Sequence, residues 1–257
     1  MTHDYSLADR LTAGETVFTV WSSLPDLGLI EVFAQGPFGA VTLDMQHGAH
    51  HVESVARGLS PVITGGKSAV VRIAQGDFGM ASRALDMGAD AVIAPMINSI
   101  EDAKAFRDAM KYPPVGGRSW GPTRALKLRG LAGGNDYLST ANTKTLAFAM
   151  IETREAYAIA ADIAALDGID GLFVGPSDFS IAWSNGAAVN PASEDMQEAV
   201  ANVARIARDA GKHAAIFAAS PSAAPSYIEL GYRFIALGLD TVMLDAGQKA
   251  ILAAAEA

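Results

Sequence analysis

Short apolar runs alternate with longer amphipathic segments along the chain. Eight runs are apolar throughout, as buried parallel strands are, and lie at residues 16–21, 40–43, 69–73, 91–94, 146–151, 171–174, 213–217 and 234–237. The segments between and after them favour helices, at residues 25–35, 52–64, 78–87, 100–110, 154–166, 192–210, 221–230 and 242–255. Glycine, a common helix stop signal, ends several of them, at Gly88, Gly168, Gly211 and Gly231.

This alternation predicts an α/β fold in which eight strands and eight helices close into a (β/α)8 TIM barrel. We expect one domain over residues 1–257, ending in a helix at about 241–255. A doubly wound open sheet is the alternative. The long interruption at residues 111–145 contains paired prolines and paired glycines, and we expect it to lie over the mouth of the barrel as a lid or pocket wall.

Carboxylates follow two neighbouring strands of the predicted barrel. Glu152 ends one apolar run, and Asp178 comes soon after the next. The carboxyl ends of parallel strands share one face, so these side chains can meet there and bind one divalent metal ion. Two oxygen ligands suit magnesium or manganese, and cobalt or zinc is possible. Each carboxylate alone is equally well explained as the cap of the helix that follows it.

Other polar residues reach the same face. His47 lies three residues beyond Asp44 at the end of another strand. Arg72 sits inside an apolar strand and needs an anionic partner, either an internal carboxylate or a substrate. Backbone N–H groups around Ser177 and Asp178, at a predicted helix start, can hold a substrate carboxylate. The neighbouring His50 and His51 are more simply explained as structural residues.

The composition narrows the classes of function. A chain of 257 residues with 50 % hydrophobic content can bury a large core. Its net charge of −9 argues against nucleic acid or an anionic membrane as a partner. The absence of cysteine excludes disulfides and thiolate catalysis, and we find neither a secretory signal nor an apolar run long enough to span a bilayer. We therefore expect a soluble, cytoplasmic protein.

Four sequence blocks carry a resemblance to a known family. They are IETREA at residues 151–156, GPSDFS at 175–180, RALDMGA at 83–89 and YPP at 112–114. Over most of its length the chain resembles the HpcH/HpaI aldolase family, the metal-dependent pyruvate aldolases related to 4-hydroxy-2-oxoheptanedioate aldolase and 2-keto-3-deoxy sugar-acid aldolases. The resemblance implies a TIM barrel of the phosphoenolpyruvate/pyruvate type and a class II carbon–carbon lyase.

The resemblance also implies roles for single residues. Glu152 and Asp178 match the metal ligands. His47 matches the catalytic base, acting through or beside a metal-bound water, and Asp86 matches the acid that raises the proton affinity of that base. Arg72 matches the residue that stabilises the enolate and the developing alkoxide, which would make the substrate its anionic partner.

Further positions match the substrate pocket and the assembly. Trp21 matches a pocket-wall tryptophan, and Gly175, Pro176 and Ser177, with Asp178, form the block expected to bind the substrate. Family resemblance implies a homohexamer in which the last helix packs on a neighbour, and the apolar character of that helix is compatible with this.

The implied reaction joins pyruvate, or a related 2-oxo acid such as hydroxypyruvate, to an aldehyde through a metal-bound enolate, or runs the reverse cleavage. Decarboxylation of a 2-oxo diacid such as oxaloacetate would use the same enolate, and a non-catalytic barrel that binds a small acid is a further alternative. A Schiff-base aldolase needs a lysine in the mouth, but Lys67, Lys144 and Lys212 precede strands, and Lys127 is only a loop candidate.

The chain departs from the family pattern near the expected site. Met45 and Gln46 replace the glycine and glutamate that commonly follow the aspartate, so the site should carry one negative charge less. Met150 stands where relatives often have glutamine, and Trp120 stands where small or aliphatic residues are usual. Acceptor specificity is therefore the property that transfers least from relatives to this chain.

Overall fold

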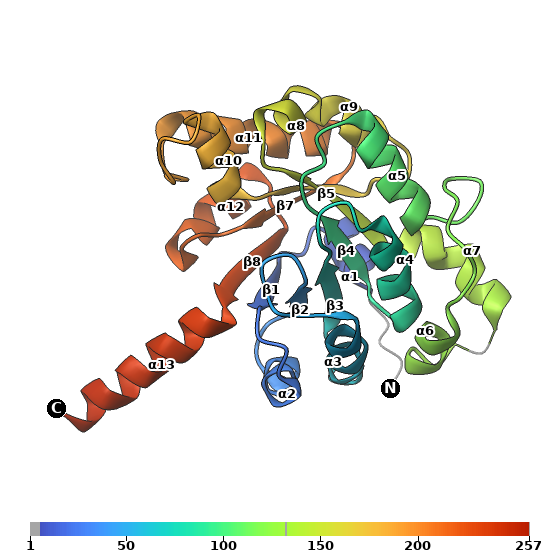
Figure 1. Ribbon diagram of the computed structural model, residues 1–257, viewed down its shortest axis with the longest axis horizontal. Coiled ribbons are helices and arrows are strands. Elements are labelled where there is room, and N and C mark those ends of the chain that lie inside the picture. Colours follow the sequence, from blue (N-terminus) through green and yellow to red (C-terminus); the bar gives the residue numbers. More distant parts are fainter. Residues whose placement is uncertain (1–5, 132, 257) are drawn as a thin grey trace.

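The computed structural model describes residues 6–131 and 133–256, in which eight parallel strands close into a barrel with helices outside it (Figure 1). The strands are β1 (Val17–Ser22), β2 (Ala40–Asp44), β3 (Ser68–Arg72), β4 (Ala91–Ala94), β5 (Leu146–Ile151), β6 (Gly171–Val174), β7 (His213–Phe217) and β8 (Phe234–Leu239). Each strand pairs with the next in sequence, and β8 returns to pair with β1. The predicted barrel is confirmed, and the open-sheet alternative is wrong.

Most helices lie close to the predicted bounds. They are α2 (Leu27–Gln35), α3 (Val52–Thr64), α4 (Phe78–Met87), α5 (Ile100–Met110), α11 (Glu194–Asp209) and α12 (Ala224–Leu230), the last preceded by a 3-10 turn at Pro221–Ala223. The helix expected at 154–166 breaks at Ile159 into α8 (Arg154–Ala158) and α9 (Ala160–Ala165). Two further helices are α1 (Leu7–Thr12), before the first strand, and α10 (Pro176–Trp183), directly after β6.

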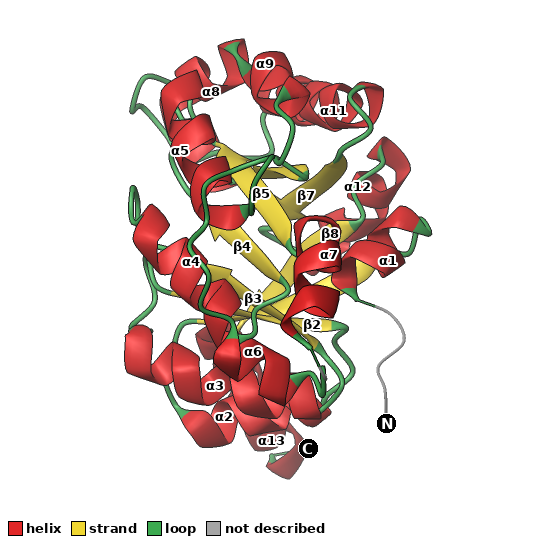
Figure 2. Cartoon of the chain, turned by 90° about the vertical axis from the view of Figure 1, so that its right-hand side faces the viewer, coloured by secondary structure: helices red, strands yellow, loops and turns green. Residues whose placement is uncertain are grey.

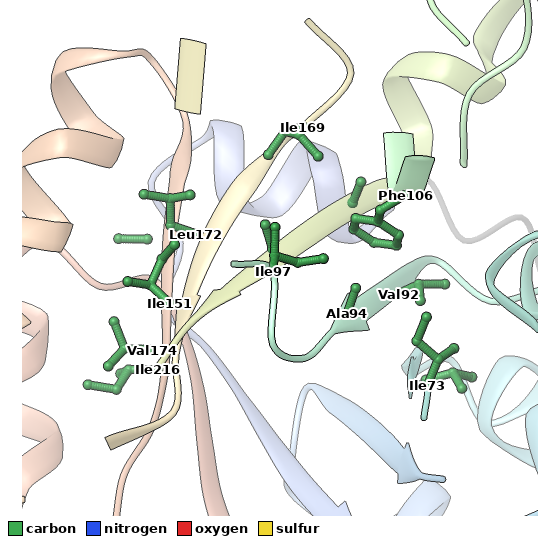
Figure 3. Packing of buried hydrophobic residues seen from close by; sticks show 14 of the residues in the cluster. Ile73, Val92, Ala94, Ile97, Phe106, Ile151, Ile169, Leu172, Val174 and Ile216 are labelled. Atoms are coloured by element: carbon green, nitrogen blue, oxygen red, sulfur yellow. The ribbon is translucent and has the colours of Figure 1, made fainter. Parts of the chain in front are cut away.

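The apolar core has two layers because side chains alternate along each strand. In β5, Leu146, Phe148 and Met150 fill the barrel interior, whereas Ile151 faces the helices. Figure 3 shows part of this outer layer, where Ile151 and Phe106 lie among other buried apolar side chains.

The short helix α1 closes one end of the barrel. Leu7, Ala8 and Leu11 are buried in the same cluster as the interior residues of the strands. A capping box fixes the start of this helix, because the Ser6 side chain accepts a hydrogen bond from the Asp9 N–H and the Asp9 side chain accepts one from the Ser6 N–H. With this end filled, the open pocket lies at the carboxyl ends of the strands.

Residues 111–145 do not form the expected lid. They contain α6 (Thr123–Leu128) and α7 (Gly134–Lys144), and they connect the end of α5 to the start of β5. Both points lie at the amino ends of the strands, so the segment runs over the closed end, and Figure 2 shows α7 beside α1. The prediction treated the segment as following β4 directly, but α5 lies between them and carries the chain back to the amino ends of the strands.

A buried lysine anchors the segment there. Lys111 is fully buried, and its ammonium donates hydrogen bonds to the carbonyls of Asn142 (2.8 Å) and Thr145 (2.7 Å). It also pairs with the Asp170 carboxylate at 2.7 Å, just before β6. Burial lowers the pKa of Lys111 and raises that of Asp170, and the ion pair opposes both shifts.

The expected C-terminal helix is present as α13 (Asp240–Ala255), which extends away from the barrel (Figure 1). Asp240 is its one buried residue within the described chain, and Val242, Leu244, Ile251 and Leu252 are exposed. Nowhere in the described ranges is a helix both long enough and apolar enough to cross a bilayer.

Replacing Lys111 with methionine should destabilise the protein by roughly 3 kcal/mol, because the Asp170 carboxylate would lose its buried partner. Urea denaturation measures the free energy of unfolding. Lys104→Met, at an exposed position of α5, is the matched control and should change it little. Equal stability of the two variants would show that the ion pair does not anchor the segment.

Candidate active site

A cavity of about 310 Å³ opens at the carboxyl ends of the strands. Every predicted site residue except Asp86 lines it, namely Trp21, His47, Arg72, Glu152 and residues 175–178. The two-residue period of the strands brings several of them inward. In β5, for example, Leu146, Phe148 and Met150 face the interior, and Glu152 continues that face at the mouth.

Glu152 presents a carboxylate oxygen that lacks a partner. The side chain is buried, and its Oε1 accepts a hydrogen bond from the Met96 N–H at 2.7 Å. Its Oε2 is also buried and has no hydrogen-bond partner in the described part of the chain. Burial raises the pKa of Glu152 to about 7; the Met96 N–H opposes this shift, and the nearby Asp178 charge adds to it. An unpaired oxygen of this kind fits a cation.

The backbone around Glu152 is shaped to hold this arrangement. Met96 adopts a φ of 54°, a conformation rare outside glycine, and thereby aims its N–H at Glu152. A Cβ atom at Gly175 would come within 2.4 Å of Glu152 Oε2, so any larger residue there would collide with this carboxylate. The backbone at Met96 and Gly175 therefore fixes the position of the Glu152 carboxylate.

Asp178 lies in the first turn of α10, exposed at the rim of the cavity. The capping explanation is wrong for both carboxylates, since Thr153 caps α8 and Gly175 occupies the N-cap position of α10. No side chain caps α10, and residues 175–178 at its start line the cavity. Within residues 6–131 and 133–256, no third histidine, aspartate or glutamate extends this pair into a larger metal-binding cluster.

The anionic partner of Arg72 is Asp44. Arg72 donates from Nε to Oδ1 at 2.8 Å and from Nη2 to Oδ2 at 2.6 Å, and both side chains are nearly buried. Burial alone would raise the pKa of Asp44, but the guanidinium holds it below its usual value of 3.8. The expectation that a substrate supplies this partner is corrected: an internal carboxylate does so. The two residues are direct cross-strand neighbours, a register that the sequence does not reveal.

Apolar residues complete the cavity, and sequence reasoning missed most of them. Phe173, Phe217 and Leu239 line it together with Trp21. The Trp21 ring lies 5.3 Å from that of Phe217 and 5.9 Å from that of Phe173, and the Arg72 guanidinium stacks over it at 4.9 Å. An apolar residue at a strand end looks the same in sequence whether it fills a core or lines a pocket.

The three neighbouring histidines have different environments. His47 is exposed at the cavity rim, in the turn that follows β2. His50 is buried, hydrogen-bonded to the Ser22 and Ser54 hydroxyls, and burial lowers its pKa to about 4. His51 caps α3 through its side chain. The structural interpretation of His50 and His51 is confirmed.

Asp86 lies outside the cavity. It is near the end of α4, toward the amino ends of the strands, and its Oδ1 accepts a hydrogen bond from Arg118 at 2.6 Å. Arg118 is buried and stacks on the Tyr112 ring at 4.6 Å, beside the half-exposed Trp120. A single chain therefore does not bring Asp86 to His47, and the expected contact is absent from the described chain.

The chain belongs to the HpcH/HpaI aldolase/citrate lyase family, whose model matches residues 18–246. It is 34 % identical to a hydroxypyruvate/pyruvate aldolase of Rhizorhabdus wittichii, over 95 % of this chain and 96 % of that protein. It is also 34 % identical to a 4-hydroxy-2-oxo-heptane-1,7-dioate aldolase of Salmonella dublin, over 95 % and 92 %. The predicted family is confirmed.

Solved structures of similar proteins have the same fold as this chain. An HpcH/HpaI aldolase/citrate lyase family protein from Burkholderia cenocepacia J2315 superposes with a TM-score of 0.86 at 27 % identity, covering 98 % of this chain and 99 % of that one. Macrophomate synthase superposes with a TM-score of 0.85 at 26 % identity, covering 98 % and 89 %. The barrel is thus the fold of the family.

Without added metal, Glu152→Gln should be more stable than the wild type above pH 7. Folding favours the protonated carboxyl, so the wild type loses stability as the pH rises from 4.5 towards about 7. The glutamine amide does not ionise. The free energy of unfolding of Glu152→Gln should therefore exceed that of the wild type by roughly 3 kcal/mol at about pH 8. Urea denaturation with a chelator measures it. Glu155→Gln, at an exposed site, is the control, and equal profiles for wild type and Glu152→Gln would contradict a buried carboxyl with a raised pKa.

Proposed function

We propose that this protein is a divalent-metal-dependent aldolase that forms or cleaves a carbon–carbon bond between pyruvate, or a related 2-oxo acid such as hydroxypyruvate, and an aldehyde. The observation that carries the proposal is the buried, unpartnered Glu152 oxygen beside Asp178, in the cavity that also holds His47 and Arg72. The predicted reaction class, an aldolase and hence a carbon–carbon lyase, is confirmed by the family and by the relatives.

Glu152 and Asp178 would hold the metal ion. Their oxygen donors suit magnesium or manganese, with cobalt or zinc as alternatives. When bound, the ion supplies Lewis-acid polarisation of a substrate carbonyl. The same cation would relieve the cost of burying the Glu152 charge, since it offers Oε2 the partner that the protein does not.

The remaining groups bind the substrate and stabilise charge. Residues 175–178 place the uncapped first turn of α10 at the cavity, where its N–H groups suit a substrate carboxylate. Asp44 engages Nε and Nη2 of Arg72, which leaves Nη1 to stabilise an oxyanion that develops during the reaction. His47 stands at the rim as the base that removes a proton from the 2-oxo acid. A Schiff-base route has little support, because no described lysine lines the cavity.

We further propose that Asp86 serves His47 of a second copy of the chain, within the homohexamer that the family resemblance implies. Asp86 is partly exposed and held in place by Arg118, beside the exposed Trp120. His47 is exposed on the other end of the barrel, and α13 offers unpartnered apolar residues for assembly. The net charge and the absence of cysteine support small-molecule substrates and a cytoplasmic location.

Glu152→Ala should lower metal-dependent deuterium exchange into the methyl group of pyruvate by at least about 100-fold, because the metal loses its buried ligand. Proton NMR in deuterated buffer with manganese or magnesium measures the rate. Glu155→Ala is the matched control. Full exchange in Glu152→Ala would refute the proposed function.

Mixing two inactive variants tests the role of Asp86. His47→Ala and Asp86→Asn should each lose most activity, and subunits of the two exchanged at equal amounts should regain about a quarter of the wild-type rate, because random pairing completes one site in four. No regain after exchange of subunits, verified by mass, would exclude a site shared between copies.

A further inference from the structure

The cavity has a charged side and an apolar side. Residues at the carboxyl ends of β2, β3, β5 and β6 supply the charged groups, whereas Trp21, Phe173, Phe217 and Leu239 form a surface that we call the apolar wall. Phe217 and Leu239 are only partly buried, and Phe217 packs edge-on against Trp21, with the rings at 88°. The wall therefore presents hydrocarbon surface to the cavity.

The wall is held in place by polar contacts behind it. Leu239 directly precedes Asp240, whose buried carboxylate accepts hydrogen bonds from the N–H groups of Ser23 (2.6 Å) and Leu24 (2.7 Å). On its other side, the Trp21 indole donates to Asp44 at 3.2 Å. Because these contacts fix the wall before a ligand arrives, little ordering cost remains for binding.

The described lining residues of one chain offer no unpaired lysine or arginine to an acidic acceptor. Among the described lining residues, Asp44, Glu152 and Asp178 are carboxylates, and Arg72 is the one lysine or arginine. Two of its nitrogens are bound to Asp44, and the proposed function uses Nη1 for an oxyanion that develops during the reaction. The proposed metal ion would be engaged by Glu152, Asp178 and the 2-oxo acid, so a second carboxylate, on the aldehyde, would meet the apolar rings of this chain.

We infer that the aldehyde acceptor is uncharged and carries an aliphatic or aromatic substituent that packs on the apolar wall. An acceptor is required only by an aldolase, so this specificity rests on the proposed function. In the condensation, the carbon beside the ketone loses a proton and bonds to the aldehyde carbon, whose oxygen takes up a proton. No oxidant or reductant is needed.

Two aldehydes of nearly equal shape test the inference. Succinic semialdehyde ends in a carboxylate, and 4-methylpentanal carries an isopropyl group in its place. With pyruvate and manganese, kcat/KM should be at least about tenfold higher for 4-methylpentanal, since methyl groups gain from an apolar pocket and a carboxylate does not. Equal values, or a preference for succinic semialdehyde, would overturn the inference.

A cation placed on the apolar wall should weaken the preference for the uncharged aldehyde. Leu239→Lys is expected to lower the ratio of the two kcat/KM values at least about tenfold, while Leu239→Met, which keeps an apolar side chain of similar volume, should retain it. An unchanged ratio in an active Leu239→Lys variant would show that acceptors do not use the wall. If Leu239→Lys is inactive, the ratio of the two kcat/KM values in the wild type and in Leu239→Met decides whether the inference holds.

Deuterium exchange into pyruvate, measured on the wild type without any aldehyde, distinguishes a failure of the proposed function from a failure of the inference about the acceptor. Absence of metal-dependent exchange would refute the proposed function itself. Exchange together with a preference for succinic semialdehyde would refute only the acceptor class.

Discussion

The buried ion pair between Arg72 and Asp44 is the contact on which the mouth of the barrel depends. Removing two charges from water costs several kcal/mol each, so the pair persists only because its geometry is bidentate and its remaining oxygen capacity is used. Asp44 also accepts from the Trp21 indole and from the Gln46 and Gly48 N–H groups. The pair therefore joins β2 to β3, orders the turn that carries His47, and orients the apolar wall.

Glu152, the other buried carboxylate at the mouth, is left incomplete. Its Oε1 accepts a hydrogen bond from the Met96 N–H, and its Oε2 is buried against Gly175 without a partner in the described chain. The Asp44 charge is thus neutralised within the protein, whereas the Glu152 carboxylate has a buried oxygen that a cation from solution would satisfy under the proposed function. This contrast separates the group that positions the site from the group that would bind the metal.

The direction of the chain distributes residues between the two ends of the barrel. Each strand delivers its last side chains to the mouth, and each helix returns the chain to the closed end. Asp86 and the segment at 111–145 lie on that return path, which explains why they meet each other through Arg118 and do not reach His47 in the same chain. The buried Lys111 and Asp170 pair fixes the segment at that end.

The sequence alone determined the barrel, the strands and most of the residues that line the cavity, because apolar runs and the rule of shared strand ends depend on local pattern and chain direction. It could not determine contacts that depend on register or on exposure. The pairing of Arg72 with Asp44 required the alignment of β2 with β3, and the unpartnered Glu152 oxygen required knowing where Met96 and Gly175 lie. The apolar wall was likewise invisible, because Phe217 and Leu239 differ from core residues only in how much of their surface the closed barrel leaves exposed.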